Sequence, residues 1–250
     1  METKIDFTSP EYYENRELSW IKFDRRVLNE ARDKSIPLLE RLKFVSITSS
    51  NLDEFFMVRV ASLKDMVHAG YKKRDIAGMT ATEQLTAINK ETRKLVDLQY
   101  STYNRSLIPL LNQKGIYIID KHEALTDKQA EFVDQYFMEN VYPVVTPMAV
   151  DASRPFPLIR NKTLNIAALL LNKKEKGETV FATVQVPGVL PRIVQSPGEE
   201  GAVSYILLEQ IIEKNIQKLF SNYEILCAYP YRIMRNADLT IDDDEASDLL

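Results

Sequence analysis

Apolar side chains recur three and four positions apart through most of the first 110 residues, which is the spacing of amphipathic helices. The first predicted helix is capped by Ser19 and runs to Asp33. Its inward face is expected to carry Trp20, Phe23, Val27 and Leu28. A second, shorter helix should begin after Pro37 and end in the serine pair that precedes Asn51.

A third helix is predicted to begin at Asn51, whose side chain can cap it, with Glu54 completing a capping box. Gly70 should end this helix, because glycine is favoured at helix C-termini. The sequence Thr80–Glu83 is another capping box. It opens a long helical pattern that meets no glycine or proline before Pro109.

The pattern changes after Gly115. A short β-branched run, Ile116–Ile119, predicts a strand, and Thr126 should begin an amphipathic helix. Four prolines between residues 141 and 160 exclude a long helix, so this stretch is expected to be an irregular connection.

Two further runs, Thr163–Leu171 and Thr179–Val186, predict an antiparallel hairpin. Helical spacing returns from Ile206 to Leu219, a strand should follow from Tyr223 to Met234, and a last helix should begin at Leu239. Because the sequence stops partway through that helix, we expect a truncated piece of a longer protein.

The expected fold is multidomain α and α+β. A helical bundle occupies residues 1–110, and an α+β domain, incomplete at its C-terminus, occupies residues 111–250. The length of 250 residues is enough for one large or two ordinary domains, each with a core.

Charge and composition narrow the class of protein. Lysine and arginine number 32 against 36 acidic residues, a net charge of −4, which disfavours a protein that coats nucleic acid. The single cysteine, Cys227, cannot form an internal disulfide, and the N-terminus lacks a signal-peptide pattern. The apolar run Ile166–Leu171 is too short to span a bilayer. The expected location is the cytoplasm, with peripheral membrane contact left open.

Few residues of the sequence have the pattern of a catalytic or ligand-binding site. The seven glycines form neither a dinucleotide-binding fingerprint nor a phosphate-binding loop, and no group of residues has metal-ligand spacing. Both histidines, His68 and His122, are expected on the surface. The acidic run Asp242–Glu245 lacks the alternating ligands of a calcium loop and suits a helix N-terminus.

Three motifs nevertheless stand out, in this order along the chain. They are Glu17–Lys64, which contains Ser-Ser-Asn-Leu-Asp-Glu-Phe; Thr146–Asp151 followed by Pro155–Pro157; and Arg235–Leu239 followed by the acidic run. Together they resemble the N-terminal and head domains of bacterial polyphosphate kinase. That family extends a chain of inorganic phosphate with the terminal phosphate of ATP, through a phosphohistidine.

The resemblance implies that the chemistry lies outside this chain. Family members carry two more domains, of phospholipase D-like fold, which hold the phosphorylated histidine and most nucleotide and Mg²⁺ contacts. Nothing here matches them, so we expect no catalytic residue and no metal ligand in this chain, and no activity from the chain alone. The resemblance further implies ATP or ADP and polyphosphate as partners, and a homodimer or higher homo-oligomer formed through the head domain.

Asn51 is the one site residue that the resemblance implies, as a contact to the adenine end of ATP. An amide suits a heterocycle because it both donates and accepts hydrogen bonds. The competing interpretation is that Asn51 only caps a helix, and the two roles are compatible.

Basic residues that could line a polyphosphate path are Arg59, Arg154, Arg160 and Lys162, although scattered cations are more often a solvated surface. Two alternatives stay open. The chain could be a non-catalytic oligomerisation or interaction module, or a single-strand nucleic-acid binder, for which Tyr229, Tyr231 and Arg232 are only a faint signal.

Overall fold

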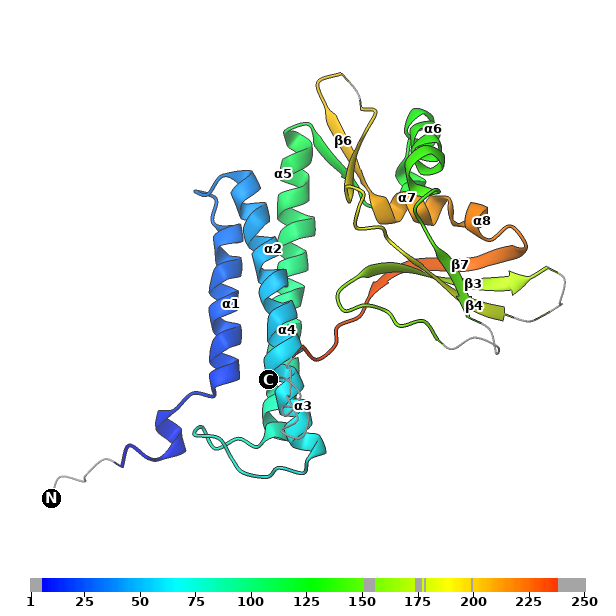
Figure 1. The fold of residues 1–250 in the computed structure, drawn as a ribbon. Coiled ribbons are helices and arrows are strands. Elements are labelled where there is room, and N and C mark those ends of the chain that lie inside the picture. The colour runs from blue at the N-terminus through cyan, green and yellow to red at the C-terminus, as the bar shows by residue number, and fades with distance from the viewer. Residues whose placement is uncertain (1–5, 151–155, 174–176, 178, 199, 238–250) are drawn as a thin grey trace, which may run out of the picture. The chain divides into compact units, whose positions relative to one another are not determined.

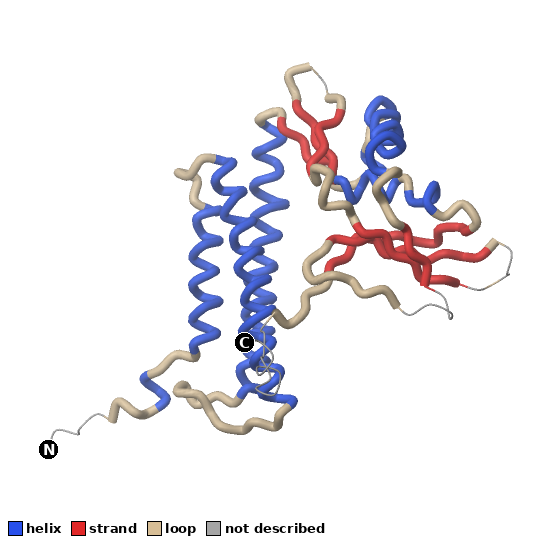
Figure 2. The backbone as a smooth tube through the Cα atoms, in the orientation of Figure 1, coloured by secondary structure: helices blue, strands red, loops and turns tan. Residues whose placement is uncertain are grey.

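A computed structural model describes residues 6–150, 156–173, 177, 179–198 and 200–237. Contacts divide the chain into two compact units, one comprising the chain up to Leu110 together with the segment from Met234, and the other Leu111–Ile233. The described strands all belong to the second unit, whereas the first is helical (Figure 1, Figure 2). The expected class, a helical bundle followed by an α+β fold, is therefore confirmed.

The described part of the helical unit consists of the short turn η1, the helix α1 and two long helices that π-turns interrupt (Figure 1). In chain order its elements are η1 (Pro10–Tyr12), α1 (Arg16–Arg32), α2 (Leu38–Phe55), η2 (Phe56–Val60), α3 (Ala61–His68), α4 (Ala81–Thr102), η3 (Tyr103–Leu107) and α5 (Ile108–Gln113).

The second and third predicted helices are one continuous helix, so the break predicted at Asn51 is wrong. Helix α2 passes through Asn51 and continues through the π-turn η2 into α3. Asn51 is therefore not an N-cap, and Glu54 completes no capping box there. No glycine or proline occurs from Leu38 to His68, and Leu52 and Phe55 extend the buried stripe, so packing overrides the capping preference of asparagine.

The start of α1 also differs from the prediction. Asn15, not Ser19, is the N-cap, and its Oδ1 accepts hydrogen bonds from the backbone N–H groups of Glu17, at 3.1 Å, and Leu18, at 3.0 Å. The buried face of α1 excludes Phe23, which is 47% exposed. Its members are Ile21, Asp24, Leu28 and Ala31.

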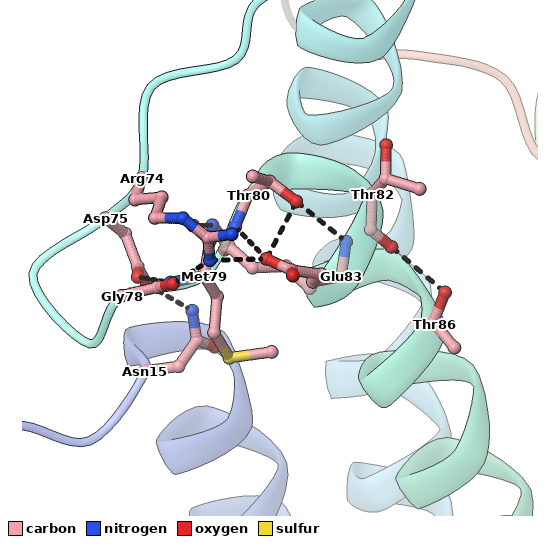
Figure 3. A network of polar contacts seen from close by, with 10 residues as sticks. Asn15, Arg74, Asp75, Gly78, Met79, Thr80, Thr82, Glu83 and Thr86 are labelled. Atoms are coloured by element: carbon pink, nitrogen blue, oxygen red, sulfur yellow. Dashed lines mark hydrogen bonds and ion pairs between the residues drawn. The ribbon is translucent and has the colours of Figure 1, made fainter. Parts of the chain in front are cut away.

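The capping box at the start of α4 is confirmed. Thr80 Oγ1 accepts from the Glu83 N–H at 3.3 Å, while the Glu83 carboxylate accepts from the Thr80 N–H at 2.7 Å (Figure 3). The helix continues past Pro109, because the π-turn η3 immediately before it already departs from the regular hydrogen-bond ladder.

Within its described residues, the second unit holds two sheets and three α-helices, together with the short helical turns η4 and η5. Its elements are β1 (Ile116–Ile119), η4 (His122–Ala124), α6 (Asp127–Tyr136), η5 (Phe137–Val141), β2 (Pro147–Val150), β3 (Leu164–Asn172), β4 (Thr179–Gln185), β5 (Ile193–Ser196), β6 (Val203–Leu207), α7 (Leu208–Lys214), α8 (Ile216–Leu219) and β7 (Tyr223–Arg232).

The smaller sheet has the order β1-β6-β5, with β1 parallel to β6, and the larger sheet is antiparallel with the order β2-β4-β3-β7. Alternate residues of β3, Ile166, Ala168 and Leu170, lie in the core of this unit. Residues of α7, among them Ile211 and Ile212, cover them from one side of the sheet. This core is separate from that of the helical unit.

Several strand predictions are confirmed and three need correction. The β1 strand, the β3–β4 hairpin and β7 lie where predicted, and Thr126 caps α6. The proline-rich connection contains β2, which tolerates Pro147 because Pro147 is the first residue of an edge strand. Strand β5 was not anticipated.

The helix predicted from Ile206 is displaced. Ile206 belongs to strand β6, and the helical segment after it is split into α7 and α8. Strand β6 runs into α7 without an intervening glycine or proline. The apolar spacing therefore places the end of this strand in the predicted helix. The helix predicted from Leu239 lies outside the described residues.

Candidate functional site

Helix α1 pairs with the continuous helix formed by α2 and η2, and their side chains meet in antiparallel register. The residue numbers rise along one helix as they fall along the other. The three joined pairs are Glu17 with Arg59, Trp20 with Phe55, and Asp24 with Asn51.

The first two pairs fix the register of the helices. Arg59 Nη1 lies 3.2 Å from a carboxylate oxygen of Glu17, and both side chains are largely shielded from solvent. The rings of Trp20 and Phe55 stack with centroids 4.3 Å apart and planes 6° from parallel. Such an aromatic pair adds roughly 0.5–1.5 kcal/mol to what burial alone supplies. Arg59 is therefore engaged within the helical unit.

Asn51 lies beyond these pairs on α2 and is half-buried. Its Nδ2 donates a hydrogen bond of 2.9 Å to Oδ1 of Asp24. Because the carboxylate takes the donor end of the amide, the other end, Oδ1, keeps its capacity to accept. The arrangement leaves Asn51 suited to a ligand that carries a hydrogen-bond donor.

Asp24 is the residue in this site that sequence reasoning missed. Its side chain is fully buried, and among the described residues its Oδ2 is one of two buried side-chain polar atoms without a hydrogen-bond partner. Burial raises the pKa of Asp24 to about 6, and the hydrogen bond from Asn51 opposes that rise. A signal was present in the sequence, since a carboxylate stands on the stripe that includes Ile21 and Leu28.

The third sequence motif meets the first in the helical unit. The Ala237 N–H donates to the carbonyl oxygen of Met57 at 3.1 Å, and Asn236 Nδ2 donates to Oδ2 of Asp65 at 3.1 Å. A cavity of about 280 Å³ lies between the two segments. Its polar lining includes Lys64, Asp65, His68, Arg235 and Asn236.

The second sequence motif lies partly in β2, in the other unit. Residues Pro147–Val150 pair with β4, and Phe156 stacks on Phe181 of that strand with ring centroids 5.6 Å apart. Arg160 and Lys162 also belong to this unit and are exposed, while Arg154 and the acidic run lie outside the described residues.

The two histidines differ in their surroundings. His68 is exposed at the end of α3, as predicted. His122 is only partly exposed. Its backbone N–H donates to Gln210 Oε1 at 3.0 Å, and its ring Nδ1 lies 3.3 Å from the same oxygen.

Within the described ranges, no group of three or more histidine, cysteine, aspartate or glutamate side chains is arranged to hold a metal ion. None of the described helices combines the length and the apolar character needed to cross a membrane.

Comparisons with known proteins account for both units. A model of the polyphosphate kinase N-terminal domain matches residues 13–119, and a model of the polyphosphate kinase middle domain matches residues 128–250. The two matched models follow each other in the order of the helical and α/β units, and they define the chain as two domains of a phosphotransferase family. The chain belongs to the polyphosphate kinase family, of which it holds the N-terminal and middle domains.

Individual relatives agree with these two family matches. The chain is 50% identical to a polyphosphate kinase of Halalkalibacterium halodurans, over 98% of this chain and 35% of that protein. It is 48% identical to one of Lactiplantibacillus plantarum, over 98% of this chain and 34% of that protein. The crystal structure of polyphosphate kinase from Porphyromonas gingivalis superposes with a TM-score of 0.79 at 29% identity, covering 92% of this chain and 34% of that one. The chain thus spans about a third of the length of these relatives.

Proposed function

We propose that this chain supplies the adenine-binding end of the ATP site in an enzyme that reversibly transfers the terminal phosphate of ATP to inorganic polyphosphate through a phosphohistidine. The phosphorylated histidine and the Mg²⁺ ligands belong to other domains of that enzyme, which is cytoplasmic and forms a homodimer or higher homo-oligomer. Asn51 is the residue of this chain that contacts the base.

The observation that carries the proposal is the state of the Asn51 amide. Asn51 lies inside α2, so helix capping no longer explains it. Its side chain is half-buried, and the hydrogen bond to Asp24 leaves the amide oxygen able to accept. Adenine offers a donor that fits this oxygen, its exocyclic amine.

The test replaces Asn51 in a full-length polyphosphate kinase that carries these residues. The base does not react, so its contact stabilises the ground state and the transition state about equally. Asn51→Ala should therefore raise the KM for ATP about three- to tenfold, the equivalent of roughly 0.5–1.5 kcal/mol, and leave kcat nearly unchanged. Steady-state kinetics with ATP as the varied substrate measure both constants.

Asn51→Asp is a poor substitution here, because it would place a second carboxylate against Asp24. The informative companion measurement is the melting temperature of Asn51→Ala. If that variant melts earlier and keeps the wild-type KM, Asn51 serves only the packing of α1 on α2. The alternative function, a non-catalytic oligomerisation module, predicts this result, because such a module has no nucleotide affinity to lose.

A further inference from the structure

The carboxylate of Asp24 is buried inside the helical unit. It lies on the inward face of α1, and one of its oxygens lacks a hydrogen-bond partner among the described residues. Burying an acid in this way normally destabilises a fold unless every lone pair is satisfied. The one hydrogen bond recorded for the Asp24 side chain in the described part of the chain is the one it accepts from Asn51.

We propose that Asp24 is a positioning residue, which holds the Asn51 amide with its nitrogen inward and its oxygen toward the nucleotide, and so makes the site prefer adenine to guanine. This inference rests on the base contact proposed for Asn51. It adds a second residue, on a different helix, and a reason for base selectivity.

The chemistry of the two side chains supports the assignment. An asparagine amide can turn over and exchange its donor and acceptor ends, and only its neighbours decide which end points where. An ionised carboxylate accepts hydrogen bonds and cannot donate them, so it fixes the amide with Nδ2 toward Asp24. Since the pKa of Asp24 is about 6, the group is predominantly ionised at pH 7.5, and the orientation is fixed there.

The preference for adenine over guanine follows from which end of the Asn51 amide remains available to the nucleotide. Adenine presents an exocyclic amine, which donates to a carbonyl oxygen, while guanine presents an oxygen at the same ring position. The Asn51 amide oxygen would form no hydrogen bond with this guanine oxygen, and the two oxygens would repel each other. If the amide were free to turn, its nitrogen could serve guanine equally well.

The experiment compares ATP with GTP in a full-length polyphosphate kinase that carries these residues. Asp24→Leu removes the acceptor and keeps the branched shape of the side chain. It should raise the KM for ATP about three- to tenfold at unchanged kcat, and lower the preference for ATP over GTP, as the ratio of kcat/KM values, by a similar factor. Asp24→Asn introduces an amide that can donate as well as accept, so it no longer fixes the Asn51 amide and should lower the preference for ATP over GTP as well.

Thr92→Val is the matched control. Thr92 Oγ1, on α4, is the other buried side-chain atom without a hydrogen-bond partner among the described residues. Its replacement also removes a buried polar group, yet it should change neither KM nor the ATP preference. A melting temperature for each variant separates folding from recognition, and Asp24→Ala replaces Asp24→Leu if the latter does not fold.

Two results would overturn the proposal, and they differ. If Asn51→Ala raises the KM for ATP while the Asp24 variant keeps wild-type KM and base preference, the base contact stands and Asp24 does not position it. If Asn51→Ala itself leaves KM unchanged, the base contact is wrong, and the role of Asp24 fails with it.

Discussion

At the scale of single residues, Asp24 makes the stability of the helical unit depend on pH. Its folded pKa of about 6 lies above the unfolded value of 3.8, so the folded state holds the proton more tightly. The resulting stabilisation is fully present below the unfolded pKa and is lost as pH rises through about 6.

Asp24→Asn should remove this dependence. Relative to wild type, the variant should gain free energy of unfolding between pH 4 and pH 7, by about 3 kcal/mol at most for a shift of this size. Chemical denaturation of this chain at both pH values measures the gain. An equal difference between the two proteins at pH 4 and pH 7 would contradict the raised pKa. Asp33, which is exposed and whose pKa is lowered by hydrogen bonds from Ser35, offers Asp33→Asn as a control without this gain.

At the scale of elements, Asn15 connects the start of α1 to the loop before α4. Its Oδ1 caps α1, while its Nδ2 donates to Oδ2 of Asp75 at 2.6 Å, and the other oxygen of Asp75 accepts from the Met79 N–H at 2.7 Å (Figure 3). Asn15→Ala should cost about 1–3 kcal/mol, since it removes a cap and leaves a carboxylate oxygen without its donor. Asn15→Ser restores the cap alone, because serine caps helices as well as asparagine does. Denaturant unfolding should therefore place Asn15→Ser between wild type and Asn15→Ala, and equal losses for the two variants would show that the cap contributes nothing.

The same scale shows what the sequence could and could not predict. Periodicity located most of the helices, the β3–β4 hairpin and both threonine caps, because these signals are local. The polar residues Ser49–Asn51 predicted a break that does not exist, since the decision depends on the packing of α1 and α4 against this helix. Asn51 was identified through family resemblance. Its partner Asp24 was not, because a hydrogen bond across 27 positions depends on the register of two helices, which no local pattern records.

At the scale of the whole molecule, the chain should bind nucleotide weakly, if at all, and make no polyphosphate alone. It spans about a third of the length of its relatives, and among its described residues no three histidine, cysteine, aspartate or glutamate side chains are grouped to hold a metal ion. Neither histidine has the surroundings of a phosphate carrier, since His68 is exposed at a helix end and His122 faces Gln210.

Purified chain incubated with ATP and Mg²⁺ should therefore leave all phosphate acid-soluble and acquire no acid-labile phosphorylation. The positive control is a full-length polyphosphate kinase under the same conditions, and His122→Ala is the variant of interest should any label appear. ATP-dependent polymer formed by the wild-type chain would contradict the assignment of the chemistry to other domains. Labelling that His122→Ala abolishes would contradict it more narrowly, because it would place a phosphohistidine in this chain itself.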